Sequence, residues 1–156
     1  FDVLFIPDAT GMVNMIAPQL QYNGIDVDLM GTNLWNSKKT PLVTDYVQGA
    51  IFPDGFYPES ESEKTANFLS LYSEATGSLP GYSEIIAYDT ATIVMSTLSS
   101  AAVTSREEMV KYLQSNTFDN TITCPTSFDL QGEPVKSLEL FQVTGNEIKL
   151  IRSCDN

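Results

Sequence analysis

Histidine is absent from this chain of 156 residues, and cysteine occurs only twice. Serine and cysteine hydrolases need an imidazole to take up and return a proton, so neither mechanism is available within the chain. The cysteines, Cys124 and Cys154, lie far apart in the sequence, whereas zinc sites use closely spaced cysteine and histidine ligands. Neither a glycine-rich phosphate loop nor a calcium-binding loop occurs. We therefore expect no metal site, no cofactor and no enzymatic activity.

Basic residues are also scarce, with eight lysines and arginines against twenty acids, for a formal net charge of −12. A field of this sign repels the phosphates of nucleic acid, so we expect no nucleic-acid partner. No apolar run is long enough to span a membrane, and no signal peptide is visible. The chain begins in a strand-like apolar run without a methionine, and we therefore expect that a segment has been removed upstream.

Hydrophobic periodicity predicts an α/β fold. Short apolar runs predict strands at residues 3–6, 27–31 and 49–52, and apolar spacing predicts helices at 10–22, 60–76, 82–102 and after Ser105. The first of these helices lies between the first two strands, and short β-α-β links favour a parallel sheet. Ser60 or Ser62 is the expected cap of the second helix, and Ser105 with Glu108 predicts a capping box.

The carboxyl-terminal part of the sequence has a different pattern. Strand-like residues at 121–124 precede a turn at 129–132, and two further runs, 138–143 and 147–151, predict a β-hairpin because a turn sequence separates them. Earlier in the chain, Pro53 begins a segment of two prolines, a glycine and two aromatic residues. Such a segment is a poor helix and a poor central strand, so we expect a connection, one that passes between lobes.

In open α/β sheets, ligands bind beyond the carboxyl ends of the parallel strands. Here those ends carry hydrogen-bonding groups and one tryptophan: Asp8, Thr10, Thr32, Asn33 and Trp35. The first amides of the helix near Thr10 would hold a carboxylate, and Trp35 would stack on an apolar part of a ligand. The alternative is structural: Asp8 and Thr10 only cap the helix, and Trp35 only fills the core.

The two cysteines permit two interpretations. An even number of cysteines suits one disulfide in an oxidising compartment, in which case Cys124 and Cys154 would tie the end of the chain to its body. The alternative is a pair of buried free thiols.

Several stretches in fixed order carry a family resemblance. They are Phe1-Asp-Val-Leu-Phe-Ile-Pro-Asp8, Ala17-Pro-Gln-Leu-Gln-Tyr-Asn-Gly24, Leu29-Met-Gly-Thr-Asn-Leu-Trp35, Gly49-Ala-Ile-Phe-Pro-Asp-Gly-Phe56, Ala87-Tyr-Asp-Thr-Ala91 and Phe128-Asp-Leu-Gln-Gly132. Over essentially its whole length the chain resembles the type I periplasmic solute-binding proteins of the branched-chain amino acid type. A related branch, the lipoprotein activators of peptidoglycan synthases, uses the same fold for protein contact.

The resemblance implies that the chain is the carboxyl-terminal part of a two-lobed protein, with a parallel sheet flanked by helices and a terminal hairpin. Residues 1–52 would belong to the second lobe, and residues 53–58 would form a hinge crossing that includes Pro53, Asp54, Gly55 and Phe56. Helices at 59–117 would pack on the missing first lobe or be covered by self-association. Residues 118–156 would supply the return strands and hairpin of the second lobe.

The resemblance also implies a function. Such a protein captures a small polar solute, of the amino acid, amide or carboxylate class, by closing two lobes, and delivers it to an ABC-type transporter or a sensor in the membrane. Asn33 stands where an acid often meets the ammonium group of an amino acid, which leaves the solute class open. The alternative is a protein-binding module such as a peptidoglycan-synthase activator. Either protein would lie in the periplasm or be anchored at the extracytoplasmic surface.

Overall fold

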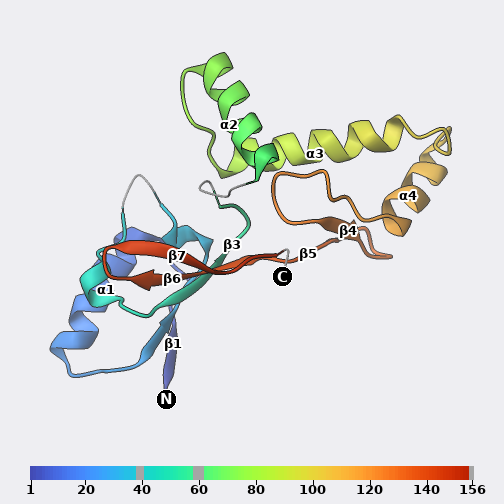
Figure 1. Ribbon diagram of the computed structural model, residues 1–156. Helices are drawn as coiled ribbons and strands as arrows, with labels where there is room; N and C mark the ends of the chain where they lie inside the picture. Colours follow the sequence, from blue (N-terminus) through green and yellow to red (C-terminus); the bar gives the residue numbers. More distant parts are fainter. Residues whose placement is uncertain (38–40, 58–61, 155–156) are drawn as a thin grey trace. The chain divides into compact units, whose positions relative to one another are not determined.

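The computed structural model describes residues 1–37, 41–57 and 62–154, and its helices and strands follow an α/β order (Figure 1). The chain divides into two compact units. Unit 1 contains Phe1–Gly55 and Leu138–Cys154, and unit 2 contains Phe56–Ser137. In the described part of the chain, no helix combines the length and apolar character needed to cross a membrane.

Unit 1 is built on a mixed five-stranded sheet. Its strands are β1 (Val3–Phe5), β2 (Asp28–Met30), β3 (Ile51–Asp54), β6 (Glu139–Thr144) and β7 (Glu147–Arg152), in the spatial order β1-β2-β3-β6-β7. The first three are parallel to one another, and β6 and β7 add as antiparallel strands. Helix α1 (Thr10–Tyr22) and the short 3-10 helices η1 (Asn33–Trp35) and η2 (Thr44–Tyr46) complete the unit. The predicted parallel sheet and first helix are confirmed.

The core of unit 1 lies on one face of this sheet. Strand alternation places Phe52 of β3 and Phe141 of β6 on the same side, where their rings stack with centroids 5.7 Å apart. Trp35 lies on the same cluster, with its ring centroid 6.2 Å from that of Phe52. Along β1 and β2 every second side chain points to the opposite face of the sheet, which is open to solvent. On that face Phe5 is 55% exposed and Met30 is 43% exposed.

The predicted terminal hairpin is present as β6 and β7. Gly145 takes a φ of 62°, a left-handed conformation that favours glycine, in the turn between the two strands. The side chain of Gln48 fixes this turn: its Nε2 donates to the Gly145 carbonyl at 2.8 Å, and its Oε1 accepts from the Gly145 amide at 2.9 Å. A residue far away in the sequence therefore holds the hairpin in place.

The prediction that the connection begins at Pro53 is wrong, because Pro53 is part of a strand. Pro53 and Asp54 are the last two residues of β3 and lie opposite Leu140 and Glu139 of β6. A proline is tolerated there because β3 pairs with β2 only at Ile51, which leaves β6 as the one neighbouring strand at this position. The connection itself begins at Gly55. Pro58, the last residue of the expected hinge, lies outside the described residues.

Unit 2 contains three helices and a small two-stranded sheet. These are α2 (Glu63–Thr76), α3 (Tyr82–Leu98), α4 (Arg106–Ser115), β4 (Thr126–Phe128) and β5 (Pro134–Lys136). Phe56, Phe68 and Ile85 form its buried apolar cluster. Helix α2 follows Ser62, and the other proposed cap, Ser60, is outside the described residues. Ser105 caps α4 by accepting from the Glu108 amide at 3.3 Å, as predicted.

The carboxyl-terminal part of the chain differs from the prediction in two ways. The prediction gives residues 118–137 to the return strands of the second lobe, but they belong to unit 2, because β4 pairs with β5 and contacts α4. The return to unit 1 comes at Leu138. Residues 121–124 form bends rather than a strand. Residues 155–156, which end the predicted return segment, lie outside the described residues.

Asp89 explains why residues 121–124 do not form a strand. This carboxylate of α3 is only 3% exposed, and it accepts from the amides of Ile122 at 2.6 Å and Thr123 at 3.0 Å, and from the Thr123 hydroxyl. Backbone donors that a strand would direct to a neighbouring strand are directed to one side chain instead. Lys136 of β5 donates to the same Thr123 hydroxyl, which links the small sheet to the network.

The stability of unit 2 is expected to depend on pH through Lys136. Burial lowers the pKa of this ammonium below its ordinary value of 10.5, and the charge of Asp89 opposes part of that shift. The folded chain therefore binds this proton more weakly than the unfolded chain, and the free energy of unfolding rises as the pH rises through the lowered pKa and levels off above 10.5. Denaturant unfolding from neutral pH upward should show this rise in the wild type and not in Lys136→Gln. Lys111→Gln, which removes an exposed lysine of α4, should retain it, and parallel curves for all three would contradict the assignment.

Both cysteines are disulfide-bonded, and because the chain contains only two, Cys124 is joined to Cys154. Closing the loop between them restricts the unfolded chain and should add about 3 to 4 kcal/mol to the free energy of unfolding. We expect Cys124→Ala/Cys154→Ala to lose that amount in denaturant titration, and the reduced wild type to behave in the same way. Equal stability of the oxidised and reduced chains would exclude this contribution.

Candidate functional site

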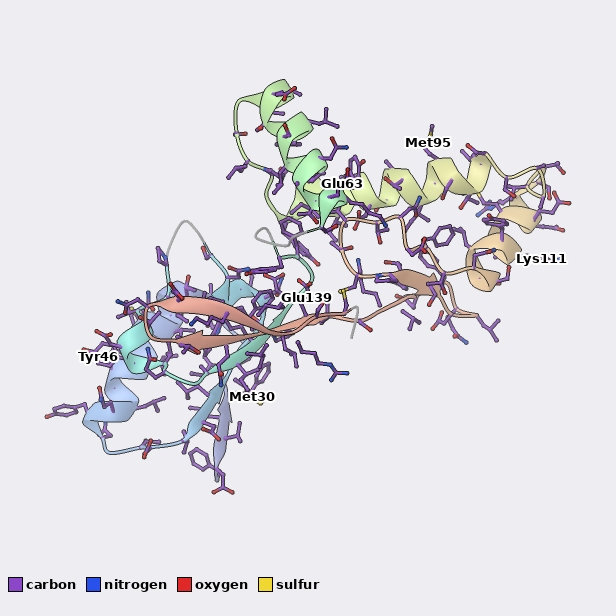
Figure 2. All side chains as sticks on the ribbon, viewed as in Figure 1. Met30, Tyr46, Glu63, Met95, Lys111 and Glu139 are labelled. Atoms are coloured by element: carbon purple, nitrogen blue, oxygen red, sulfur yellow. The ribbon has the colours of Figure 1, made fainter. Side chains whose placement is uncertain are left out.

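The carboxyl ends of β1 and β2 lie side by side in unit 1. The two strands are parallel and in register, with Phe5 opposite Met30, and the amide of Ile6 continues the ladder by donating to the Met30 carbonyl at 2.8 Å. Figure 2 labels Met30, the last residue of β2. The amide of Gly31 in turn donates to the carbonyl of Ile51 at 3.0 Å. The segments that follow the two strands therefore leave the sheet at the same edge, as the parallel arrangement predicts.

The amino-terminal turn of α1 opens at this edge without a side-chain cap. Its N-cap residue is Ala9, and among the described residues the exposed Asp8 accepts only from the Ala9 amide, at 2.7 Å, rather than from an amide inside the helix. A Cβ added to Gly11 would have no atom within 4 Å, so the space beside this turn is open. Free amides at a helix start attract a carboxylate or another anion. Asp8 therefore does not cap the helix, contrary to the structural alternative.

Thr10 is the first residue of α1 and is almost fully buried. Neither its side chain nor its backbone is open to solvent, so the accessible residue next to it in the first turn of the helix is the exposed Gly11. The structure thus separates two neighbours that the sequence placed in one candidate site, since Asp8 is exposed and Thr10 is not.

The loop after β2 presents Asn33 to solvent. Thr32 accepts from the amide of Leu34 at 3.3 Å, which begins the 3-10 helix η1. This turn leaves the side chain of Asn33 exposed and that of Leu34 50% exposed. Between Gly31 and Trp35 the exposed side chains are therefore one amide and one apolar group, while Thr32 organises the backbone.

Trp35 does not have the ligand-stacking position proposed from the sequence. Its side chain is 0% exposed, and a Cβ added to Gly31 would lie 2.3 Å from two atoms of the indole, so the ring packs flat on the Gly31 backbone. The indole Nε1 is buried and has no hydrogen-bond partner among the described residues. A ring without exposed surface cannot stack on a solute, so the core-filling alternative describes Trp35 and its role is to position the loop.

A contact that the sequence did not reveal joins this loop to the end of β3. The Nδ2 of Asn36 donates to Oδ2 of Asp54 at 2.8 Å, and Oδ1 of Asp54 accepts from the Gly55 amide at 2.7 Å. Asp54 is buried, and it lies opposite Glu139 of β6, which Figure 2 labels. No local pattern predicts this contact because its partners belong to different elements. One expected hinge residue, Asp54, is thus bonded to the loop that carries Asn33.

The proposed hinge residues lie where the chain leaves unit 1. Pro53 and Asp54 end β3, Gly55 is the last residue of unit 1 in this segment, and Phe56 belongs to the apolar cluster of unit 2. The hinge role of these four residues remains a prediction. Among residues 1–37, 41–57 and 62–154, no group of three acids or cysteines is arranged to hold a metal ion.

Parallel strands with polar loops at their carboxyl edge define an α/β fold of the kind that binds ligands at that edge. The sequence profile of the periplasmic binding protein family matches residues 1–147. The chain therefore belongs to the periplasmic binding protein family, as the sequence resemblance predicted. The comparison with curated proteins gives no match.

Solved structures of low sequence identity share the fold. A branched-chain amino acid ABC transporter periplasmic ligand-binding protein from Burkholderia xenovorans is 14% identical with a TM-score of 0.76, over 97% of this chain and 43% of that one. The substrate-binding protein LivJ from Streptococcus pneumoniae, in complex with isoleucine, is 22% identical with a TM-score of 0.64, over 97% and 44%. LpoA from Haemophilus influenzae is 13% identical with a TM-score of 0.65, over 97% and 26%. The chain thus spans less than half the length of each.

The contact between Gly31 and Trp35 yields a prediction about stability. Gly31→Ala would drive a methyl group into the indole, and because the ring fills the core it cannot move aside, so we expect a loss of about 2 to 3 kcal/mol in the free energy of unfolding. The matched control is Gly11→Ala, whose methyl group meets open space in a helix and should leave stability unchanged or raise it by up to ~1 kcal/mol. Equal effects of the two substitutions in denaturant titration would refute the packing argument.

Proposed function

We propose that this chain supplies one side of the ligand site of an extracytoplasmic solute-binding protein, which captures a small polar solute by closing two lobes. The observation that carries the proposal is that the uncapped, open start of α1 follows β1 and the exposed Asn33 follows β2, so both segments leave the sheet at the same edge. This edge therefore carries donors of two kinds, backbone amide and side-chain amide.

The chemistry of this edge favours a solute that carries a carboxylate or an amide. The exposed Gly11 lies in the first turn of α1, at the positive end of the helix dipole, where a carboxylate is stabilised. Asn33 both donates and accepts hydrogen bonds, so it suits an amide or a hydroxyl without requiring a charge. Asp8 adds a negative charge beside the amides, which would attract an ammonium group and repel a second anion.

Closure would act through Pro53, Asp54, Gly55 and Phe56. The bond between Asn36 and Asp54 gives a physical route, because a solute that orders the loop carrying Asn33 also favours one position of Asp54 at the end of β3. The closed form would then be recognised by an ABC-type transporter or a membrane sensor. The fold shared with LivJ and with the protein from Burkholderia xenovorans supports this assignment.

In this proposal the protein binds its solute without transforming it, and it lies outside the cytoplasm. The chain has no histidine to act as a general base in a nucleophile–base pair. The disulfide between Cys124 and Cys154 supports an oxidising compartment such as the periplasm. The competing function is a protein-binding module, and the fold shared with LpoA is the observation in its favour.

The test is a titration of the labelled chain with amino acids, small amides and carboxylates, followed by amide chemical shifts. We expect one class of solute to shift the signals of Thr10, Gly11 and Asn33 and to leave those of α3 unchanged. The same solute at a hundred times its dissociation constant should raise the free energy of unfolding by about 2.7 kcal/mol. Asn33→Ala should weaken the response about tenfold, the loss of about one hydrogen bond to a ligand, whereas Asn23→Ala, an exposed position at the other end of α1, should not.

The affinity of Asp8→Asn for the solute shows which charged group of the solute lies near Asp8. If a carboxylate binds the amides of α1, removing this negative charge tightens binding severalfold, and if Asp8 meets an ammonium group, the same change weakens it. Asp2→Asn removes an equal charge from the exposed start of the chain and should do neither. A folded two-lobed protein that contains this chain and responds to no solute of the panel would contradict solute capture and favour the protein-binding alternative.

A further inference from the structure

A second concave site lies in unit 1, away from the edge described above. It is a groove of about 410 Å³, formed by the last turns of α1, the link that follows, the buried Leu29 of β2, and η2. Because α1 starts at the carboxyl edge of the sheet and the groove lies at its other end, the groove is separate from the candidate solute site. Figure 2 labels Tyr46 of η2, which lines it.

The groove has an apolar floor and an acidic rim. Ala17 and Leu29 are buried at its base, and Leu20, Ile25 and Tyr46 present partly exposed apolar surface. Asp26 and Asp45 also line it and are exposed. Neither carboxylate makes a hydrogen bond or ion pair with a residue of the described part of the chain, so both charges are available to a partner.

The walls of the groove are held in place before anything binds. Gln48 donates to the carbonyl of Thr44 at 2.7 Å and to that of Gly145 at 2.8 Å, which fixes η2 against the turn of the hairpin. On the opposite wall, the Ile25 amide donates to the Leu20 carbonyl at 2.9 Å, and Gly24 takes a φ of 68° to allow this tight exit from α1. A preformed groove needs little ordering when a partner binds, so more of the contact energy is retained.

We propose that this groove is a docking site for a basic segment of a partner protein, and that it takes an arginine or lysine side chain of that segment. The long methylene stem of such a side chain covers an apolar floor while its cation reaches the rim. Asp26 and Asp45 supply the complementary charge, and the ring of Tyr46 supplies a face on which a guanidinium stacks. The net charge of −12 draws a basic partner toward the chain as a whole, and the groove selects where its side chain inserts.

The openness of the rim to solvent argues for a side chain presented by a protein rather than for an enclosed metabolite. Both acids, Gln21 and Gly24 are exposed at the mouth of the groove, whereas sites for small molecules bury most of their ligand. A segment that lies across the surface can insert one side chain and leave its backbone outside. A free diamine carries the same kind of cation, so it is the main competing ligand for the groove. The experiment below distinguishes a basic peptide from a diamine.

The experiment compares three probes on the labelled chain at low ionic strength. They are the acetylated, amidated peptide Ala-Arg-Ala-Arg-Ala, the same peptide with neutral citrulline in place of arginine, and putrescine. We expect the arginine peptide to shift the signals of Leu20, Ile25 and Tyr46, and the citrulline peptide to leave them unchanged. Raising the ionic strength to about 0.15 M, where the screening length is about 8 Å, should weaken the response.

Charge variants decide whether the groove or the general acidity of the chain is responsible. Asp26→Asn/Asp45→Asn should reduce the affinity for the arginine peptide about tenfold, the amount expected for two exposed ion pairs. Asp2→Asn/Asp28→Asn removes the same charge from exposed positions outside the groove and should leave the affinity nearly unchanged.

Three outcomes would overturn the proposal. Equal losses in the two double variants would assign the binding to net charge alone, and shifts outside the groove would assign it to another surface. Tighter binding of putrescine than of the peptide would make the groove a site for small organic cations. Because all four exchanges are at exposed positions, the amide spectrum of each variant reports directly whether the fold is retained.

Discussion

The pairing of β3 with β6 is the interaction on which unit 1 depends, because the two strands come from segments separated by the whole of unit 2. Ile51 lies opposite Gln142 and Asp54 lies opposite Glu139, and between them Phe52 and Phe141 stack in the core. Backbone hydrogen bonds set the register, and aromatic burial gives it a strong preference, since a shift of one strand by one residue would turn its ring to the opposite face of the sheet. The sheet, and with it the edge where β1 and β2 end, is built on this contact.

The candidate solute site at that edge is supported by buried core residues that are not themselves exposed. Trp35 lies on Phe52 and on the backbone of Gly31, and its packing turns the loop so that Asn33 faces solvent. The start of α1 supplies amides, and the absence of a side-chain cap leaves them for a solute. Specificity in such a site comes from a few placed polar groups on a rigid support, and here the support is the aromatic cluster of β3 and β6.

Acids have two roles in this chain. The acids of the groove in unit 1 are exposed and available for recognition, whereas the carboxylate of Asp89 in unit 2 is buried and accepts from the amides of Ile122 and Thr123. A buried carboxylate is tolerated because several donors converge on it. Buried carboxylates therefore order loops, as Asp89 does in unit 2 and Asp54 does in unit 1, whereas the exposed acids of the groove are open to a cation.

Local features of the sequence determined the elements: apolar spacing set α1, the Ser105 cap set the start of α4, and the turn at Gly145 set the hairpin. Those features act over a few residues, so a single chain reveals them. Tertiary structure alone decided that Trp35 is buried, that Pro53 belongs to a strand, and that Asn36 bonds Asp54. Each of these depends on which distant segment becomes the neighbour, and no local pattern records that choice because it follows from how the whole sheet packs.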